Sequence, residues 1–180
     1  MTTPTLIVVS GPPGSGKTQL AHAVAPLIPC PAVCRDEIKE GMVHAAGPGY
    51  VAAPGDPLTV RTFEAFFDVV RALVEAEVSL VAEAAFQDRL WRHGLEPVLE
   101  RVELRIVQCD VDLAVSWERA RQRVAARPAH AVGEHVHDLD AWTQVFGAFE
   151  RLSLEAPSLS VDTTDGYAPT LAEVAAFARD

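Results

Sequence analysis

An eight-residue segment near the start of the chain, 11–18, leaves few choices of fold. It reads GPPGSGKT and matches the pattern G-x-x-x-x-G-K-[ST] at every required position. The apolar run Thr5–Ser10 before it predicts a buried strand, and Lys17–Ala25 has the pattern of a helix. A glycine-rich turn between a strand and a helix lets main-chain N–H groups and the positive end of the helix dipole face one anion. The segment is therefore predicted to bind a polyphosphate.

The same segment predicts a nucleoside triphosphate and a magnesium ion as ligands. The amine of Lys17 is expected to reach the β- and γ-phosphates, and the hydroxyl of Thr18 is expected to ligate Mg²⁺. Motors, GTPases and small kinases all use such a loop, so the loop alone does not define the reaction. The residues of the loop predicted to bind the nucleotide are Gly11, Pro12, Pro13, Gly14, Ser15, Gly16, Lys17 and Thr18.

Short apolar runs alternate with helical patterns along the rest of the chain. Continuous apolar strands separated by helices predict a parallel sheet covered on both faces, which is a three-layer α/β/α fold, here in one domain over 1–180. Ligands of such sheets bind at the carboxyl ends of the strands. The further expected strands are Ala32–Cys34, Ser79–Glu83, Glu103–Cys109 and Leu159–Val161. The further expected helices are Asp36–His44, Leu58–Val78, Asp88–Arg101, Asp112–Ala126, Leu139–Leu152 and Leu171–Arg179.

The composition disfavours several other classes of protein. The 180 residues carry a net charge of −10, and an acidic surface repels nucleic-acid backbones. No run approaches the ~18 apolar residues of a membrane span, and the first residues lack the basic start of a signal peptide, so we expect a cytoplasmic protein. Cys30, Cys34 and Cys109 are expected to be reduced and structural, because the Cys30–Cys34 spacing has no second pair to complete a zinc site.

Charged residues follow the second and third expected strands, where a reacting group is expected to bind. Asp36 is the predicted catalytic base, which would take the proton of a hydroxyl group attacking in line with the γ-phosphate. Lys39, one helical turn further on, and Arg35 are predicted to bind the acceptor. Glu83 ends an apolar strand and is predicted to serve the magnesium waters or the acceptor. The alternatives are a helix cap for Asp36, solvated charges for Arg35 and Lys39, and a satisfied buried carboxylate for Glu83.

Arginines gather after the fourth expected strand. Arg119, Arg123 and Arg127 are spaced four apart and share one helical face, where three like charges are unfavourable unless an anion binds there. Arg123 and Arg127 are predicted to cover the transferring phosphoryl group as part of a lid over about 124–137, and Arg119 to bind the nucleotide. A solvated basic face paired with acids such as Glu118 is the alternative. The nearby histidines lack partners at metal-ligand spacing; they are His130, His135 and His137.

Together these elements resemble the small P-loop kinases of the AAA_33 type, a group that includes the polynucleotide 5′-kinase domain, zeta toxins, chloramphenicol phosphotransferase and gluconate kinase. The resemblance covers nearly the whole chain and rests on the 11–18 loop, Asp36-x-x-Lys39, Glu83 and Arg123-x-x-x-Arg127. It implies a five-stranded parallel sheet in the order 2-3-1-4-5 with a small arginine lid. It also implies that Asp36 is the base and that Lys39 replaces the arginine of the polynucleotide kinases. The segment that contains Thr163 resembles the one beside the adenine in this group.

These features favour a kinase that uses ATP and Mg²⁺ to phosphorylate a hydroxyl group of a small-molecule acceptor. A polynucleotide 5′-hydroxyl or nucleotide-sugar kinase and a non-catalytic P-loop ATPase module are the alternatives. The replacement at Lys39 and the acidic charge disfavour a nucleic-acid acceptor. An AAA motor is disfavoured because the sequence has no visible Walker B strand and no room for a separate helical domain. A GTPase is disfavoured because no Asn-Lys-x-Asp element is found.

Overall fold

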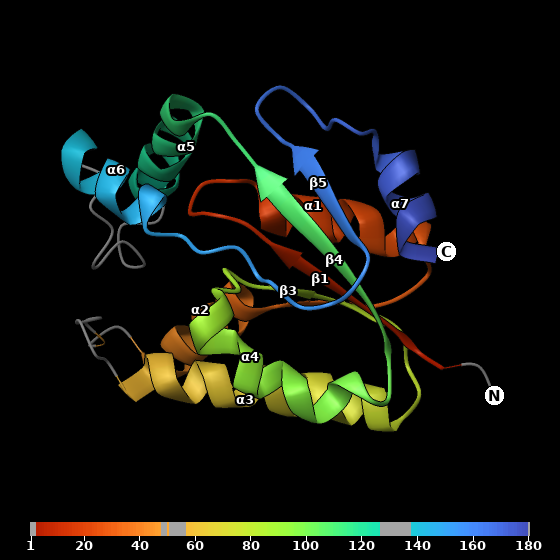
Figure 1. The fold of residues 1–180 in the computed structure, drawn as a ribbon. Helices are drawn as coiled ribbons and strands as arrows, with labels where there is room; N and C mark the ends of the chain where they lie inside the picture. The colour runs from red at the N-terminus through yellow and green to blue at the C-terminus, as the bar shows by residue number, and fades with distance from the viewer. Residues whose placement is uncertain (1–2, 48–49, 51–56, 127–137, 180) are drawn as a thin grey trace.

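The computed structural model describes residues 3–47, 50, 57–126 and 138–179. Five strands form one sheet in the order β2-β3-β1-β4-β5, and every neighbouring pair is parallel (Figure 1). The predicted strand order is therefore confirmed. The strands are β1 (Thr5–Ser10), β2 (Ala32–Cys34), β3 (Leu80–Glu83), β4 (Glu103–Asp110) and β5 (Ser158–Asp162).

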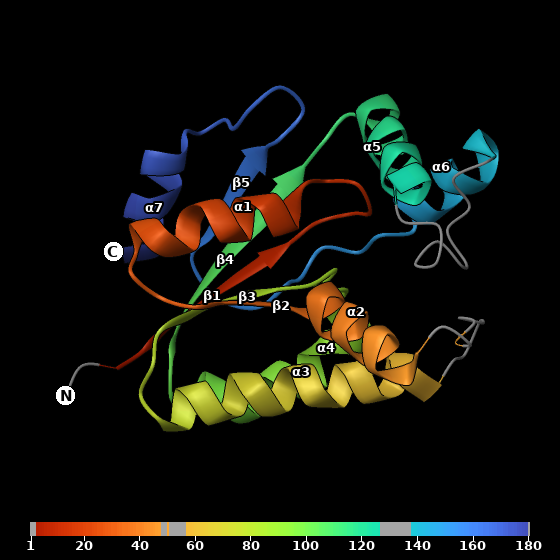
Figure 2. The ribbon, with the colours of Figure 1, turned by 180° about the vertical axis from the view of Figure 1, so that it is seen from behind.

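Helices cover both faces of the sheet. Successive residues of a strand point to opposite faces, so a continuous apolar strand has apolar side chains on both faces that must be buried. The helices are α1 (Lys17–Val24), the short 3₁₀ helix η1 (Ala25–Leu27), α2 (Arg35–Ala46), α3 (Pro57–Glu75), α4 (Asp88–Leu99), α5 (Leu113–Ala126), α6 (Leu139–Gly147) and α7 (Leu171–Arg179). Figure 2 shows α1 and α7 on one face and α2, α3 and α4 on the other. None of the helices in the described part of the chain is long and apolar enough to cross a membrane.

The two faces of β1 show how the apolar pattern builds two cores. Leu6 and Val8 are buried in the cluster formed with α3 and α4. Ile7 and Val9 are buried in the cluster formed with α1 and α7. Because β1 is the central strand and is buried on both sides, its carboxyl end is a rigid base for the loop that follows.

An aromatic cluster joins α3 to α4. The centroids of its neighbouring rings lie between 4.9 and 5.9 Å apart, and the rings are mostly edge to face or tilted. Such contacts add to the free energy gained by apolar burial. The cluster belongs to the core, because Phe66 and Phe67 of α3 are 0% and 4% exposed. The members of the cluster are Phe63, Phe66, Phe67, Phe86 and Trp91.

Replacing Gly94 of α4 by alanine is expected to lower the free energy of unfolding by about 1–3 kcal/mol. A Cβ atom at this position would lie 2.1 Å from Cε2 of Phe67, whose ring is fixed within the aromatic cluster. The overlap outweighs the better helix propensity of alanine, which is worth about 1 kcal/mol. Gly41→Ala in α2 is the matched control, because nothing lies within 4 Å of a Cβ atom there. Thermal unfolding should show Gly94→Ala below the unchanged protein and Gly41→Ala at or above it; equal stabilisation by both changes would contradict the packing.

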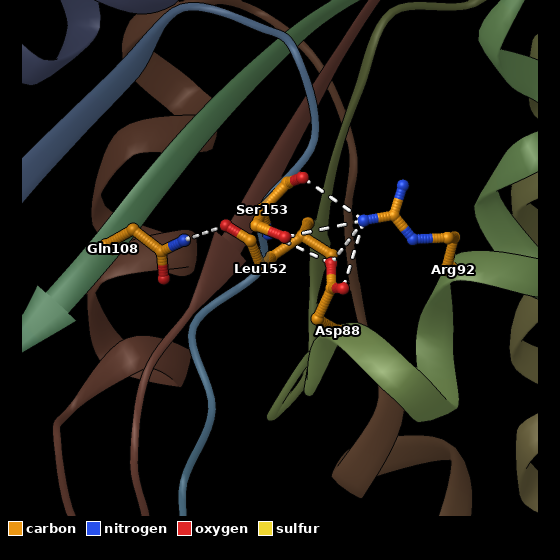
Figure 3. A network of polar contacts seen from close by, with 5 residues as sticks. All are labelled: Asp88, Arg92, Gln108, Leu152 and Ser153. Carbon is orange, nitrogen blue, oxygen red and sulfur yellow. Dashed lines mark hydrogen bonds and ion pairs between the residues drawn. The ribbon is translucent and has the colours of Figure 1, made fainter.

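The helix expected to continue to Leu152 ends instead at Gly147. The chain between Gly147 and β5 has no helix or strand and is held by side chains of two other elements (Figure 3). Nε2 of Gln108 in β4 donates to the carbonyl oxygen of Leu152 at 3.2 Å, and a carboxylate oxygen of Asp88 in α4 accepts from the main-chain N–H of Ser153 at 3.0 Å. The Leu152 side chain is buried in the core. These long-range contacts replace the local helix pattern.

The start of α2 also differs from the expectation. The helix begins at Arg35, directly after the last residue of β2, and its N-cap is Cys34. Asp36 therefore lies in the first turn and is not the helix cap. Asp112 precedes α5 and caps it, because Oδ1 of Asp112 accepts from the main-chain N–H of Ala114 at 2.8 Å.

Candidate active site

The 11–18 loop connects β1 to α1 at the carboxyl edge of the sheet, and two glycines shape it. Gly14 and Gly16 have φ angles of 72° and 70°, in the left-handed region that residues with a Cβ rarely adopt. A Cβ on Gly14 would also lie 2.4 Å from the carbonyl oxygen of Ser116. Helix α1 begins at Lys17 with Gly16 as its N-cap. The loop thus curls directly into a helix N-terminus, which is the geometry of an anion-binding loop.

Carbonyl groups of the loop are held by the rest of the protein. Oγ of Ser116 donates to the carbonyl oxygen of Pro13 at 2.9 Å, and Oγ1 of Thr163 donates to that of Ser15 at 2.7 Å. Trp142 Nε1 donates in turn to Oγ of Ser116 at 3.1 Å. A carbonyl oxygen facing a phosphate would repel it, so these contacts favour anion binding. Sequence reasoning missed Ser116, because a partner 103 residues away leaves no local signal.

Lys17 and Thr18 line a cavity of about 310 Å³ beside the loop. The Lys17 side chain is largely buried, and its Nζ donates to the carbonyl oxygen of Pro12 at 3.4 Å. Oγ1 of Thr18 donates to Oε2 of Glu83 at 3.1 Å. The hydroxyl predicted to ligate Mg²⁺ is therefore in contact with the carboxylate that ends β3. Residues lining the cavity include Gly14, Gly16, Lys17, Thr18, Arg119 and Arg123.

A second cavity of about 210 Å³ adjoins the first, because Gly16 and Arg119 line both. Thr163 and Tyr167 also line it. The Arg119 guanidinium donates to the carbonyl oxygens of Thr163 at 2.6 Å and Thr164 at 3.3 Å. The structure thus brings Arg119 and Thr163 together beside the loop, and their contact with a nucleotide stays a prediction.

Asp36 lies among positive charges. Nη1 of Arg35 donates to Oδ1 of Asp36 at 2.9 Å, and the Asp36 side chain is 55% exposed. Partial removal of water raises the pKa of Asp36, but the charge of Lys17 and the neighbouring arginines outweighs this effect and holds the pKa below its ordinary value. One of those arginines is Arg123 of α5. The fold therefore brings Lys17, Asp36 and Arg123 within electrostatic reach of one another, with the carboxylate ionised at neutral pH.

Glu83 is buried, with 1% of its surface exposed. Burial raises its pKa, and the charge of Asp36 adds to this effect, whereas Lys17 and the hydrogen bonds from Thr18 and Cys34 act in the opposite direction. The carboxylate form of Glu83 is therefore costly in the folded protein. Such a cost at the end of a central strand favours a functional reason for the residue.

Glu83→Gln is expected to raise the free energy of unfolding at neutral pH by about 1 kcal/mol, which is a rise in Tm of ~2–4 °C. The amide keeps the size of the side chain and still accepts from Thr18 while removing the buried charge. Because the folded pKa of Glu83 lies above the unfolded value, the gain should disappear as the pH falls through the folded pKa. Thermal unfolding across pH 4–8 measures this. A lower Tm for Glu83→Gln at neutral pH would contradict it.

The other two residues predicted to bind the acceptor, Arg35 and Lys39, both lie in α2. Arg35 is mostly buried, and its Nε has no hydrogen-bond partner within the described residues. Lys39 Nζ donates to Oγ1 of Thr59 in α3 at 3.2 Å. Lys39 is therefore engaged with α3 in this structure, and its contact with an acceptor stays a prediction.

The predicted lid falls largely outside the described residues. Arg123 lies in the last turn of α5 and lines the larger cavity. Arg127 lies outside the described part of the chain, as does most of 124–137. The same holds for the three histidines His130, His135 and His137.

Comparison with known families identifies the chain. Residues 6–148 match the family model AAA_33, described as an AAA domain, and this match spans more than half of the 180 residues. The chain belongs to the AAA_33 family. The match includes the whole 11–18 loop, Asp36, Glu83, Arg119 and Arg123, whereas Thr163, which lines the second cavity, lies beyond it. A search of curated proteins gave no match to this AAA_33 sequence.

Solved structures share the fold of this AAA_33 protein. A candidate kinase from Chloroflexus aurantiacus J-10-fl is 23% identical, with a TM-score of 0.85 over 99% of this chain and 98% of that one. The Mycobacterium tuberculosis APS kinase CysC, solved with AMPPNP and APS, is 16% identical, with a TM-score of 0.62 over 100% of both chains. A gluconokinase from Sinorhizobium meliloti 1021 is 19% identical, with a TM-score of 0.59 over 99% of this chain and 91% of that one. The AAA_33 chain therefore has the P-loop kinase fold.

Proposed function

We propose that this protein is a phosphotransferase that moves the γ-phosphate of ATP to a hydroxyl group of a small-molecule acceptor. One observation carries the proposal. Lys17 of the phosphate-binding loop lies close enough to Asp36 of α2 and to Glu83 of β3 to act on the pKa of both carboxyl groups. The proposed triphosphate-binding loop thus lies beside an ionised carboxylate open to solvent, which can serve as the base for transfer to a hydroxyl group, and beside a second, buried carboxylate.

The residues of the loop fit a nucleotide and its magnesium ion. The left-handed glycines and the anchored carbonyl groups leave the loop shaped for an anion, and the two adjoining cavities extend from it along Arg119. Thr18 and Glu83 supply the hydroxyl and carboxylate oxygens that Mg²⁺ prefers. Mg²⁺, when bound, neutralises negative charge on the β- and γ-phosphates. The structures solved as kinases with the same fold, one of them with AMPPNP, support ATP as the nucleotide.

The proposed reaction is a direct in-line transfer. The carboxylate of Asp36 takes the proton of the acceptor hydroxyl group, whose oxygen then bonds to the γ-phosphorus. The bond between that phosphorus and the bridging oxygen breaks, and ADP leaves. Lys17 and Arg123 offset the negative charge that develops on the transferring group. Glu83 accepts the hydrogen bond of Thr18 and so orients its oxygen.

The acceptor class can be tested with ATP radiolabelled at the γ-phosphate. The protein is incubated separately with pools of sugars, nucleosides and hydroxyl-bearing antibiotics, and with 5′-hydroxyl oligonucleotides. The net charge of −10 predicts that label enters a small molecule and not the oligonucleotides. Label in the oligonucleotides would instead support a polynucleotide kinase. Release of inorganic phosphate with no labelled acceptor in any pool would support an ATPase module and contradict the proposal.

A further inference from the structure

Three side chains of different metal-binding types meet beside the candidate active site. They come from α1, from the end of β2 and from the first turn of α2, and are His22, Cys34 and Glu37. Nε2 of His22 lies 2.6 Å from Oε1 of Glu37 and 3.7 Å from Sγ of Cys34. One ligand atom of each residue lies within 4.8 Å of those of the other two. None of the three has a role in the proposed transfer.

The spacing of these atoms suits a tetrahedral cation. Ideal bond lengths and angles place a sulfur and a nitrogen on one zinc ion about 3.6 Å apart, close to the 3.7 Å between Cys34 and His22. The imidazole and the carboxylate are hydrogen-bonded at 2.6 Å, so they must separate by several tenths of an ångström to share an ion. Both side chains are about half exposed, at 49% and 51%, so they are free to make that adjustment.

The burial of the three residues gives the cluster an open side and a closed side. Cys34 is 2% exposed and fixed at the end of β2, so its sulfur forms the floor, while His22 and Glu37 form the rim toward solvent. A cation could enter from this side and keep water as a further ligand. A thiolate, an imidazole and one carboxylate together favour zinc-type cations over Mg²⁺ or Ca²⁺, which prefer sets of oxygen ligands.

We propose that His22, Cys34 and Glu37 form a binding site for a zinc-type divalent cation. The cation bonds to Sγ of Cys34, to Nε2 of His22 and to a carboxylate oxygen of Glu37, and the thiol proton leaves to solvent. Burial and the charges of Glu83 and Glu37 raise the pKa of the free Cys34 thiol, so the cation must displace that proton. Cys34 also contacts Glu83, so the site adjoins the candidate active site through one shared side chain. The proposal does not depend on the proposed phosphotransferase activity.

Titration of the nucleotide-free protein with Co²⁺ tests the site, because thiolate ligation gives a sulfur-to-cobalt charge-transfer absorption in the near ultraviolet. We expect this band at one Co²⁺ per chain and its loss when Zn²⁺ is added. Cys34→Ser should remove the band, and His22→Ala should weaken Co²⁺ affinity by at least about tenfold. Cys30→Ser is the matched control and should keep the band, since Cys30 is outside the cluster.

The variants also distinguish a metal site from an ordinary surface ion pair. His22 is about half exposed, so His22→Ala should fold even if Cys34→Ser is destabilised, and thermal unfolding without metal checks both. The absence of a thiolate–cobalt band in the unchanged protein would overturn the proposal. A band that persists in Cys34→Ser, or that is lost in Cys30→Ser, would overturn it as well, because either result assigns the ligand sulfur to another residue.

Discussion

Asp36→Asn is expected to reduce the rate of phosphoryl transfer by roughly 10²–10⁴-fold while leaving the affinity for ATP nearly unchanged. Asparagine keeps the shape of the side chain and can still accept from Arg35, but it cannot take a proton from the acceptor. The measurement is the transfer of labelled phosphate to the acceptor found in the pool experiment, together with a separate titration of nucleotide binding. The loss should therefore fall on kcat and not on the binding of ATP.

Asp68→Asn is the control for this change, because it removes a carboxylate of similar exposure on α3 that pairs with Arg71. We expect it to leave transfer unchanged. The low pKa of Asp36 adds a second test. The base stays ionised as the pH falls through the range where an ordinary aspartate gains its proton, so Asp36 should cause no loss of rate above about pH 4. If the Asp36→Asn variant transferred phosphate at the normal rate, the assignment of Asp36 as the catalytic base would be contradicted.

Lys17→Ala is expected to damage both binding and transfer. The largely buried amine lies beside the loop and acts on the charges of Asp36 and Glu83, so its loss removes a cation from the centre of the site. We expect ATP affinity to fall about tenfold or more, which corresponds to about 1.4 kcal/mol, and the transfer rate to fall by roughly 10²–10³-fold. Calorimetric titration with ATP and the labelled-phosphate assay measure the two effects.

Arg71→Ala serves as the control for Lys17→Ala, because it removes an exposed cation that pairs with Asp68 on α3. Both measurements should be unchanged in this variant. Lys17→Ala that binds ATP as tightly as the unchanged protein would show that the loop does not hold the phosphates in the way proposed. Circular dichroism of each variant checks that a loss of binding does not come from a loss of fold.

Local patterns in the sequence predict most of the fold. The apolar run of β1, the glycines of the 11–18 loop and the start of α1 are adjacent in the chain, so one short segment contains the whole strand–loop–helix unit. The alternation of apolar strands and helices is likewise a local signal, and the strand order followed from the resemblance to P-loop kinases. The predicted end of α6 was wrong. The contacts of Gln108 and Asp88 with the chain after Gly147 join residues far apart in the sequence, so no local pattern indicates them.

The candidate site is predictable only in part for the same reason. Asp36 follows the end of β2, and parallel topology brings the carboxyl ends of the strands to one edge of the sheet. Arg123 was predicted from the spacing of the arginines along one helical face. The Ser116–Trp142 pair that holds the loop, and the His22–Cys34–Glu37 cluster, depend on residues whose spacing in the chain carries no pattern. The Cys30–Cys34 spacing indicates no zinc site by itself, since the ligands that accompany Cys34 come from α1 and α2.

Calorimetric titration of the unchanged protein with AMPPNP in the presence of Mg²⁺ tests the central claim most directly, because it needs no acceptor. The loop, the two adjoining cavities and the Thr18–Glu83 contact predict one bound molecule per chain and a lower affinity when Mg²⁺ is removed. A folded protein that takes up no AMPPNP under these conditions would contradict the assignment of residues 11–18 as a triphosphate-binding loop, and with it the proposed phosphotransferase.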